Sequence, residues 1–146
     1  MKLPSAVLFA CTHNAIRSPM AEGILKHLVG RQIFVDSAGV RPGELDLFAV
    51  EAMDEIGVDI ARHRPKSFQD LEDESYDLII SLSPEAQHRA IELTRAMACE
   101  VCFWNTLDPS IVEGSREMRM DAYRMVRDQL LKRIKGEFAA APMAGL

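Results

Sequence analysis

A cysteine and an arginine, with five residues between them, stand between a short apolar run and the beginning of a helical pattern. Cys11 follows the apolar run 6–10, and Arg17 is followed by Ser18 and Pro19, residue types that favour a helix start. A loop of this length can curl so that its backbone N–H groups point at one anion, while the planar guanidinium of Arg17 closes the rim. The spacing therefore predicts an oxyanion site on a strand–loop–helix unit.

Cys11 is the expected nucleophile of this site. Among backbone donors and at the positive end of the following helix, it is expected to be largely a thiolate at neutral pH, poised for in-line attack on phosphorus. Ser18 is expected to cap the helix and to donate to the thiolate, and Asn14 suits a left-handed kink in the loop. The competing interpretation makes Cys11 a small core residue and Arg17 a solvated charge.

The segment from Cys11 to Glu22 resembles the amino-terminal signature of the low-molecular-weight protein tyrosine phosphatases, whose fold the thioredoxin-linked arsenate reductases share. It departs from the family at His13, where glycine is usual, and at Ile16, where many members carry a second, protective cysteine. Together, the loop pattern and the resemblance predict that phosphate is bound by the run that follows Cys11, namely Thr12, His13, Asn14, Ala15, Ile16, Arg17 and Ser18.

Length and composition restrict the alternatives. The chain of 146 residues fits one domain, and a net charge of −5 without a basic run argues against nucleic acid as a partner. No run approaches the ~18 apolar residues of a membrane span, so no membrane association and a cytoplasmic location are expected. The three cysteines suit neither a disulfide framework nor a four-ligand zinc site. No metal or other cofactor is expected.

Apolar runs alternate with helical patterns along the whole chain, which predicts an α/β fold. We expect one domain over residues 1–146, with a four-stranded, parallel, doubly wound sheet, helices on both faces and the phosphate-binding loop after the first strand. Residues 139–146 are expected to form a flexible tail. The expected strands are 5–10, 32–38, 76–82 and 99–104, and the expected helices are 18–29, 47–56, 84–97 and 116–136.

Helix caps and a core-facing stripe support these boundaries. Asp46, Ser83 and Ser115 stand at helix starts, where their side chains can accept hydrogen bonds from backbone N–H groups. The last helix is expected to cover the sheet with a stripe of apolar residues at helical spacing, namely Met118, Ala122, Met125, Val126, Leu130 and Ile134.

Asp108 is the second residue with a predicted catalytic role. It precedes Pro109, which favours an extended backbone, and it follows a predicted strand at the edge where α/β sheets gather site residues. The family resemblance makes Asp108 the general acid, whereas the simpler interpretation is a turn-forming aspartate. The family usually has tyrosine where Ser110 stands, so the sequence leaves open whether phosphotyrosine is preferred.

Three further features have competing interpretations. By resemblance, Ser37 would hydrogen-bond to Asn14 and support the loop. The competing interpretation, an ordinary polar residue at the end of a strand, fits the sequence equally well. The basic stretch 62–66 is interpreted as a solvated connection. Cys99 and Cys102 have redox-motif spacing, but residues three apart on a strand point to opposite faces, which favours a packing role.

The sequence thus predicts hydrolysis of a phosphorylated protein or a small phosphomonoester through a cysteinyl-phosphate. Arsenate reduction by the same thiolate is the alternative, with phosphate or arsenate as the bound oxyanion. The related reductases place their further thiols just after the third strand, where this chain has Ser81, Leu82 and Ser83. A third hypothesis is a phosphate-binding module without turnover. The oligomeric state is left open.

Overall fold

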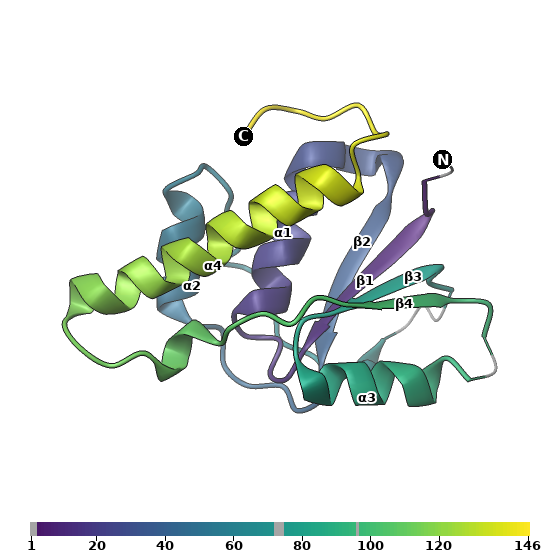
Figure 1. Ribbon diagram of the computed structural model, residues 1–146, viewed down its shortest axis with the longest axis horizontal. Coiled ribbons are helices and arrows are strands. Elements are labelled where there is room, and N and C mark those ends of the chain that lie inside the picture. The colour runs from purple at the N-terminus through teal and green to yellow at the C-terminus, as the bar shows by residue number, and fades with distance from the viewer. Residues whose placement is uncertain (1–2, 72–74, 96) are drawn as a thin grey trace.

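Four parallel strands form one sheet at the centre of the molecule, in the order β2-β1-β3-β4 (Figure 1). A computed structural model describes residues 3–71, 75–95 and 97–146. All six residues of β1 are buried, as expected for a parallel strand with neighbours on both sides and helices on both faces. The strands span Ala6–Cys11 (β1), Phe34–Gly39 (β2), Leu78–Ser81 (β3) and Glu100–Phe103 (β4).

Helices cover both faces of this sheet, which confirms the predicted single-domain, doubly wound α/β fold. Helices α1, α2 and α4 pack on one face and α3 packs on the other (Figure 1). The helices span Arg17–Val29 (α1), Leu47–Asp54 (α2), Pro84–Leu93 (α3) and Arg116–Glu137 (α4), with short 3₁₀ turns at Gly30–Gln32, Phe68–Asp70 and Pro109–Ile111.

The strand register brings the ends of all four strands to one edge of the sheet. Cys11 lies opposite Gly39 at the ends of β1 and β2, and Ala10 lies opposite Ser81 at the end of β3. Ser81 in turn lies opposite Phe103 at the end of β4. Because the strands are parallel, the loops that follow them meet at this edge.

Three of the four predicted helix caps are confirmed. Asp46, Ser83 and Ser115 each accept a backbone N–H from the first turn of α2, α3 and α4, respectively. The cap predicted at Ser18 is wrong, because α1 begins at Arg17 and its N-cap position, Ile16, makes no side-chain cap hydrogen bond. The Ser18 hydroxyl instead contacts the Cys11 sulfur, as the second part of that prediction stated.

Several predicted boundaries differ from the structure by two to four residues. The second strand begins later than predicted because residues 30–32 form a 3₁₀ turn. Helix α2 ends at Asp54, and α3 ends at Leu93, where the backbone N–H and hydroxyl of Thr94 both bond to the Ala90 carbonyl. The core stripe of the last helix is wrong at two positions, since Met118 and Met125 are exposed.

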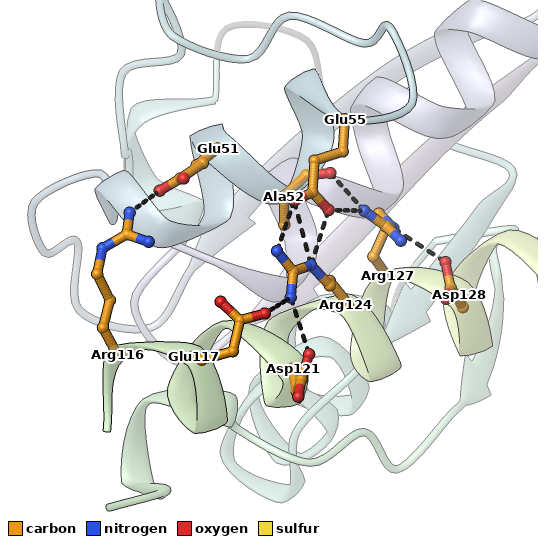
Figure 2. Close-up of polar contacts among 9 residues, drawn as sticks. All are labelled: Glu51, Ala52, Glu55, Arg116, Glu117, Asp121, Arg124, Arg127 and Asp128. Carbon is orange, nitrogen blue, oxygen red and sulfur yellow. Dashed lines mark hydrogen bonds and ion pairs between the residues drawn. The ribbon is translucent and has the colours of Figure 1, made fainter. Parts of the chain in front are cut away.

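Arginines of α4 anchor this helix to α2 (Figure 2). Glu55, just after α2, accepts hydrogen bonds from both Arg124 and Arg127. Arg127 is buried and also donates to the Ala52 carbonyl at 2.7 Å. The hydrogen bonds that Arg124 and Arg127 donate to Glu55 hold the pKa of its carboxyl down at about 2. Helix α2 and α4 are therefore joined by charged contacts at their outer edge in addition to apolar packing.

The residues after α4 turn back along α1. Ala141 is buried, and the Ala144 N–H donates to the Leu28 carbonyl at 2.9 Å. The Gln32 side chain donates to the Pro142 carbonyl. The flexibility expected for residues 139–146 stays a prediction. Within the described ranges, no helix combines the length and the apolar character that crossing a membrane requires.

Candidate active site

The loop between β1 and α1 holds the Cys11 sulfur in a buried position. Cys11 is the last residue of β1 and is 2% exposed. Its sulfur accepts the Asn14 N–H at 3.3 Å and lies 2.9 Å from the Ser18 hydroxyl oxygen. That oxygen already accepts a hydrogen bond from the Asn14 amide, so its own O–H is available to donate to the sulfur. Both contacts place a hydrogen-bonding group against the sulfur.

The backbone of the same loop presents donors to a bound anion. Within the described chain, no hydrogen bond uses the N–H groups of His13, Ala15 and Ile16. Arg17 and Ser18 follow at the start of α1, where helix N–H groups have no partner in the preceding turn. A run of such donors at a helix N-terminus is a ready site for an oxyanion.

Asn14 fixes the shape of the loop. Its φ of +52° is left-handed, as predicted, and its side chain is fully buried. The amide nitrogen donates to Ser18 and Ser37, at 2.8 and 2.9 Å. The amide oxygen accepts from the Lys66 N–H and from His63, at 3.0 and 2.9 Å. The hydrogen bond predicted between Ser37 and Asn14 is thus present, and four contacts hold this residue.

His63 and Glu22 extend this support and were missed by the sequence analysis. The stretch 62–66 was interpreted as solvated, but the His63 side chain is only 10% exposed and Nε2 bonds to Asn14. Its Nδ1 lies 3.7 Å from Glu22, whose carboxylate accepts from Ser37 at 2.5 Å. Burial is the main cause of a lowered pKa for His63. No sequence signal joined a basic connection to a loop 49 residues earlier.

The loop after β4 contributes both a contact to Arg17 and the predicted acid. The Arg17 guanidinium is buried and donates to the Thr106 carbonyl at 3.0 Å. Asp108 caps the turn Pro109–Ile111, as the turn-forming interpretation states, and its role as general acid stays a prediction. Its Oδ1 accepts from the N–H and the hydroxyl of Ser110, at 2.9 and 2.7 Å. This leaves Oδ2 as the oxygen that can exchange a proton with a substrate.

A small pocket joins these groups, with a volume of about 40 Å³. Cys11, Arg17 and Asp108 line it together, so the structure brings together the three residues predicted from distant parts of the sequence. The other lining residues are His13, Ala15, Ile16 and Ser110. Thr12 points elsewhere, since its hydroxyl donates to Ser83 at the start of α3.

Asp46 connects the loop to the helices that flank it. Its N–H donates to the Ala15 carbonyl at 3.1 Å, and its carboxylate caps α2. The buried hydroxyl of Tyr123, on α4, donates to the same carboxylate at 2.8 Å. Burial and this hydrogen bond to Asp46 raise the pKa of Tyr123. These contacts couple the position of α4 to the oxyanion loop, which is the segment 12–18 that follows Cys11.

The remaining cysteines lie away from the pocket. Cys102 packs on the sheet face covered by α1, and Cys99 packs on the face covered by α3, as the strand geometry predicts. Burial is the main cause of a raised pKa for each thiol. Among the residues that the structure describes, no group of three or more potential ligands could hold a metal ion.

Known proteins with this fold include both phosphatases and arsenate reductases. An arsenate reductase of Halalkalibacterium halodurans is 34% identical over 129 residues, which cover 88% of this chain and 91% of the relative. A low molecular weight protein tyrosine phosphatase from T. tengcongensis is 26% identical, with a TM-score of 0.75 over 92% of this chain and 98% of that structure. An arsenate reductase in the phosphate-binding state is 27% identical, with a TM-score of 0.71 over 93% and 98%.

The family comparison agrees with the loop geometry. Residues 6–140 match the family model of the low molecular weight phosphotyrosine protein phosphatases. This range begins with β1 and includes the oxyanion loop, the turn that carries Asp108 and all of α4. The chain therefore belongs to the low molecular weight phosphotyrosine protein phosphatase family, an enzyme family whose fold is shared by phosphatases and arsenate reductases.

Proposed function

We propose that this protein hydrolyses phosphomonoesters through a cysteinyl-phosphate. The observation that supports this proposal is the pocket in which Cys11, Arg17 and Asp108 meet. In the first step the Cys11 thiolate attacks phosphorus, the S–P bond forms and the ester P–O bond breaks, while Asp108 gives its proton to the leaving oxygen. Loop N–H groups and Arg17 stabilise the charge on the equatorial oxygens.

The second step returns the enzyme to its starting state. Asp108, now a carboxylate, takes a proton from water as the water oxygen attacks phosphorus. The S–P bond breaks, phosphate leaves, and the Cys11 thiolate is restored. The reaction involves no net oxidation or reduction, so it requires no thiol other than Cys11.

Arsenate reduction is a second candidate, and the names of curated relatives favour it. In that reaction the Cys11 thiolate would displace an oxygen of arsenate, and a second thiol would attack the Cys11 sulfur. This step forms a disulfide and releases arsenite, so two electrons pass from the thiols to arsenic. The second thiol must therefore reach Cys11.

The strand register puts Cys102 too far away for this step, and Cys99 precedes β4, three residues farther from the edge of the sheet where Cys11 lies. Cys102 lies opposite Ile80, and Ile80 lies opposite Phe9, which is two residues before Cys11. Two strand spacings of about 5 Å and two residues of about 3.3 Å put the Cα atoms of Cys102 and Cys11 roughly 12 Å apart. A disulfide needs Cα atoms within about 7 Å. The proposed hydrolysis fits this arrangement, whereas arsenate reduction would need a thiol supplied from outside, such as glutathione or a reduced redox protein.

Turnover of para-nitrophenyl phosphate tests the proposed mechanism. Cys11→Ser should abolish turnover, because a serine hydroxyl is not ionised at neutral pH. Asp108→Asn should slow it by roughly 10²–10⁴-fold while phosphate still binds, since only proton transfer is lost. Asp59→Asn is a matched control, because Asp59 also accepts a backbone N–H two residues on and lies outside the pocket. Full activity of Cys11→Ser would refute the mechanism.

A parallel assay separates the two candidates. Arsenate-dependent oxidation of reduced thioredoxin, or of glutathione, is followed in the wild type and in Cys99→Ser and Cys102→Ser. Phosphatase activity without arsenate turnover would support the hydrolytic proposal. Arsenate turnover in the wild type would favour reduction instead, with a thiol from outside if the turnover persists in both variants and with an internal thiol if it disappears in either. Phosphate binding without turnover in either assay would favour a binding module.

A further inference from the structure

The mouth of the oxyanion pocket carries a side chain that neither proposed step uses. His13 lines the pocket and is exposed to solvent, so it stands where a leaving group would emerge. Phosphate recognition in this loop relies on backbone N–H groups and Arg17, which a residue of any type at position 13 would leave in place. The imidazole is therefore free to act on the part of the substrate beyond the phosphoryl group.

The loop backbone sets the position of His13. The His13 carbonyl accepts the Gly43 N–H at 2.9 Å. The next residue, Asn14, is held by four side-chain hydrogen bonds. A Cβ atom on Gly43 would lie only 3.4 Å from the His13 Cβ and 3.8 Å from its Cγ. The segment around Gly43 thus borders the base of the His13 side chain.

The second exposed residue in the lining of the pocket is small. It is Ser110, whose hydroxyl donates to Asp108 at 2.7 Å. The pocket is small, with a volume of about 40 Å³, so the part of a substrate beyond the phosphoryl group must lie at its mouth. Of the two exposed residues that line the pocket, His13 has the larger side chain.

We propose that His13 is a specificity-determining residue that narrows the mouth of the oxyanion pocket and selects phosphomonoesters with slender leaving groups over those with a flat aromatic ring next to the phosphate. The proposal rests on the proposed function for its choice of ligands. It implies that this chain prefers alkyl phosphates, such as phosphorylated serine or small phosphorylated alcohols, to aryl phosphates of similar leaving-group chemistry.

Phosphonates test this selection without turnover, because their P–C bond is not hydrolysed. The affinities of methylphosphonate and benzylphosphonate are measured by calorimetry for the wild type and for His13→Gly. Removal of the side chain should raise the ratio of benzylphosphonate to methylphosphonate affinity about tenfold or more, a discrimination typical of one steric contact. His13→Gln is the matched control: it keeps a side chain of similar length and should keep the wild-type ratio.

Two results would overturn the proposal. An unchanged ratio in His13→Gly would show that the imidazole does not limit the mouth, and a fall in the ratio would show that it binds aromatic rings instead. If His13→Gly no longer binds methylphosphonate, His13→Ala, which restricts the loop backbone more, gives the same comparison. The ratio of affinities does not depend on turnover. A wild type that binds both phosphonates but hydrolyses neither para-nitrophenyl phosphate nor an alkyl phosphate such as phosphoserine would refute the proposed function alone.

Discussion

The Asn14 side chain uses all of its hydrogen-bond donors and acceptors to hold the oxyanion loop in place. Two N–H donors and two oxygen lone pairs are available to an asparagine amide, and all four are occupied here. The left-handed backbone at Asn14 is costly for most residues, and these bonds offset that cost. The same residue also gives its N–H to the Cys11 sulfur. A single residue thus links the nucleophile, through its backbone, to the three segments that its side chain contacts.

Gly39 is required by the close approach of this loop to the end of β2. A Cβ at this position would lie 2.7 Å from the Asn14 nitrogen and 2.9 Å from the His13 carbonyl carbon. Both atoms belong to the backbone, so the clash cannot be relieved by a side-chain rotation. The loop itself would have to move.

We therefore expect Gly39→Ala to lower both phosphate affinity and turnover, each by about tenfold or more, because small misplacements of a catalytic group are costly. Inhibition by inorganic phosphate and kcat on para-nitrophenyl phosphate measure the two effects. Gly136→Ala is the control: it lies in α4 with no atom within 4 Å of the added methyl group. It should leave activity unchanged and add about 0.5–1 kcal/mol of stability. Retention of wild-type phosphate affinity in Gly39→Ala would contradict this explanation.

Sequence reasoning at this scale succeeded where one residue type has one physical task. Local chemistry predicted three features correctly. They are the left-handed backbone of Asn14, the contact between Ser18 and Cys11, and the extended backbone of Asp108 before Pro109. His63 could not be found in this way, because its partner Asn14 is distant in sequence and a histidine between two arginines looks solvated. Only the folded chain shows which polar residues become buried together.

At the scale of elements, α4 is held against α2 by charged groups as well as by its apolar side. Glu55 is about one-third exposed, whereas Arg127 is nearly buried (Figure 2). The pKa of Glu55, lowered to about 2, means that its ionised form is favoured in the folded state. This contribution is complete above the ordinary carboxyl range near pH 4.5 and is lost as the pH falls toward 2.

We expect Glu55→Gln to lower the free energy of unfolding by about 1 kcal/mol at pH 7, since it leaves Arg127 with weaker partners. The difference from the wild type should shrink as the pH falls from about 4.5 to 2, which urea unfolding at several pH values measures. Glu117→Gln removes a more exposed carboxylate that also contacts Arg124, and it should change stability by less than about 0.5 kcal/mol. Equal losses at pH 7 and pH 2.5 would contradict the assigned role.

Element types were predictable, whereas element ends were less so. Every predicted strand and helix is present, since continuous apolar runs and capped helical patterns are strong local signals. The ends of α2 and α3 depend on tertiary contacts that local sequence patterns do not reveal. The same is true of which residues of α4 are buried, since Met118 and Met125 are exposed. A methionine fits a core stripe by hydrophobicity, but α4 offers only part of its circumference to the sheet.

At the scale of the whole molecule, the residues of the candidate active site lie at one edge of the sheet, and the other two cysteines lie away from that edge. Cys11 lies at the end of β1, at the base of the pocket. Cys102 and Cys99 belong to opposite faces of the sheet at β4. Ile16, in the oxyanion loop, occupies the position where many relatives would have a second cysteine.

This separation has a consequence for oxidative damage. Hydrogen peroxide converts a reactive thiolate to a sulfenic acid, which a neighbouring thiol normally traps as a reversible disulfide. Cys11 has no such neighbour among the three cysteines of the chain, so a second peroxide is expected to carry it on to sulfinic acid, which ordinary reductants do not reverse. Activity lost to excess peroxide should therefore stay lost in dithiothreitol, with a gain of two oxygen atoms on Cys11 by mass spectrometry, and full recovery would contradict this expectation. An enzyme built in this way depends on its surroundings, rather than on its own fold, to keep its nucleophile reduced.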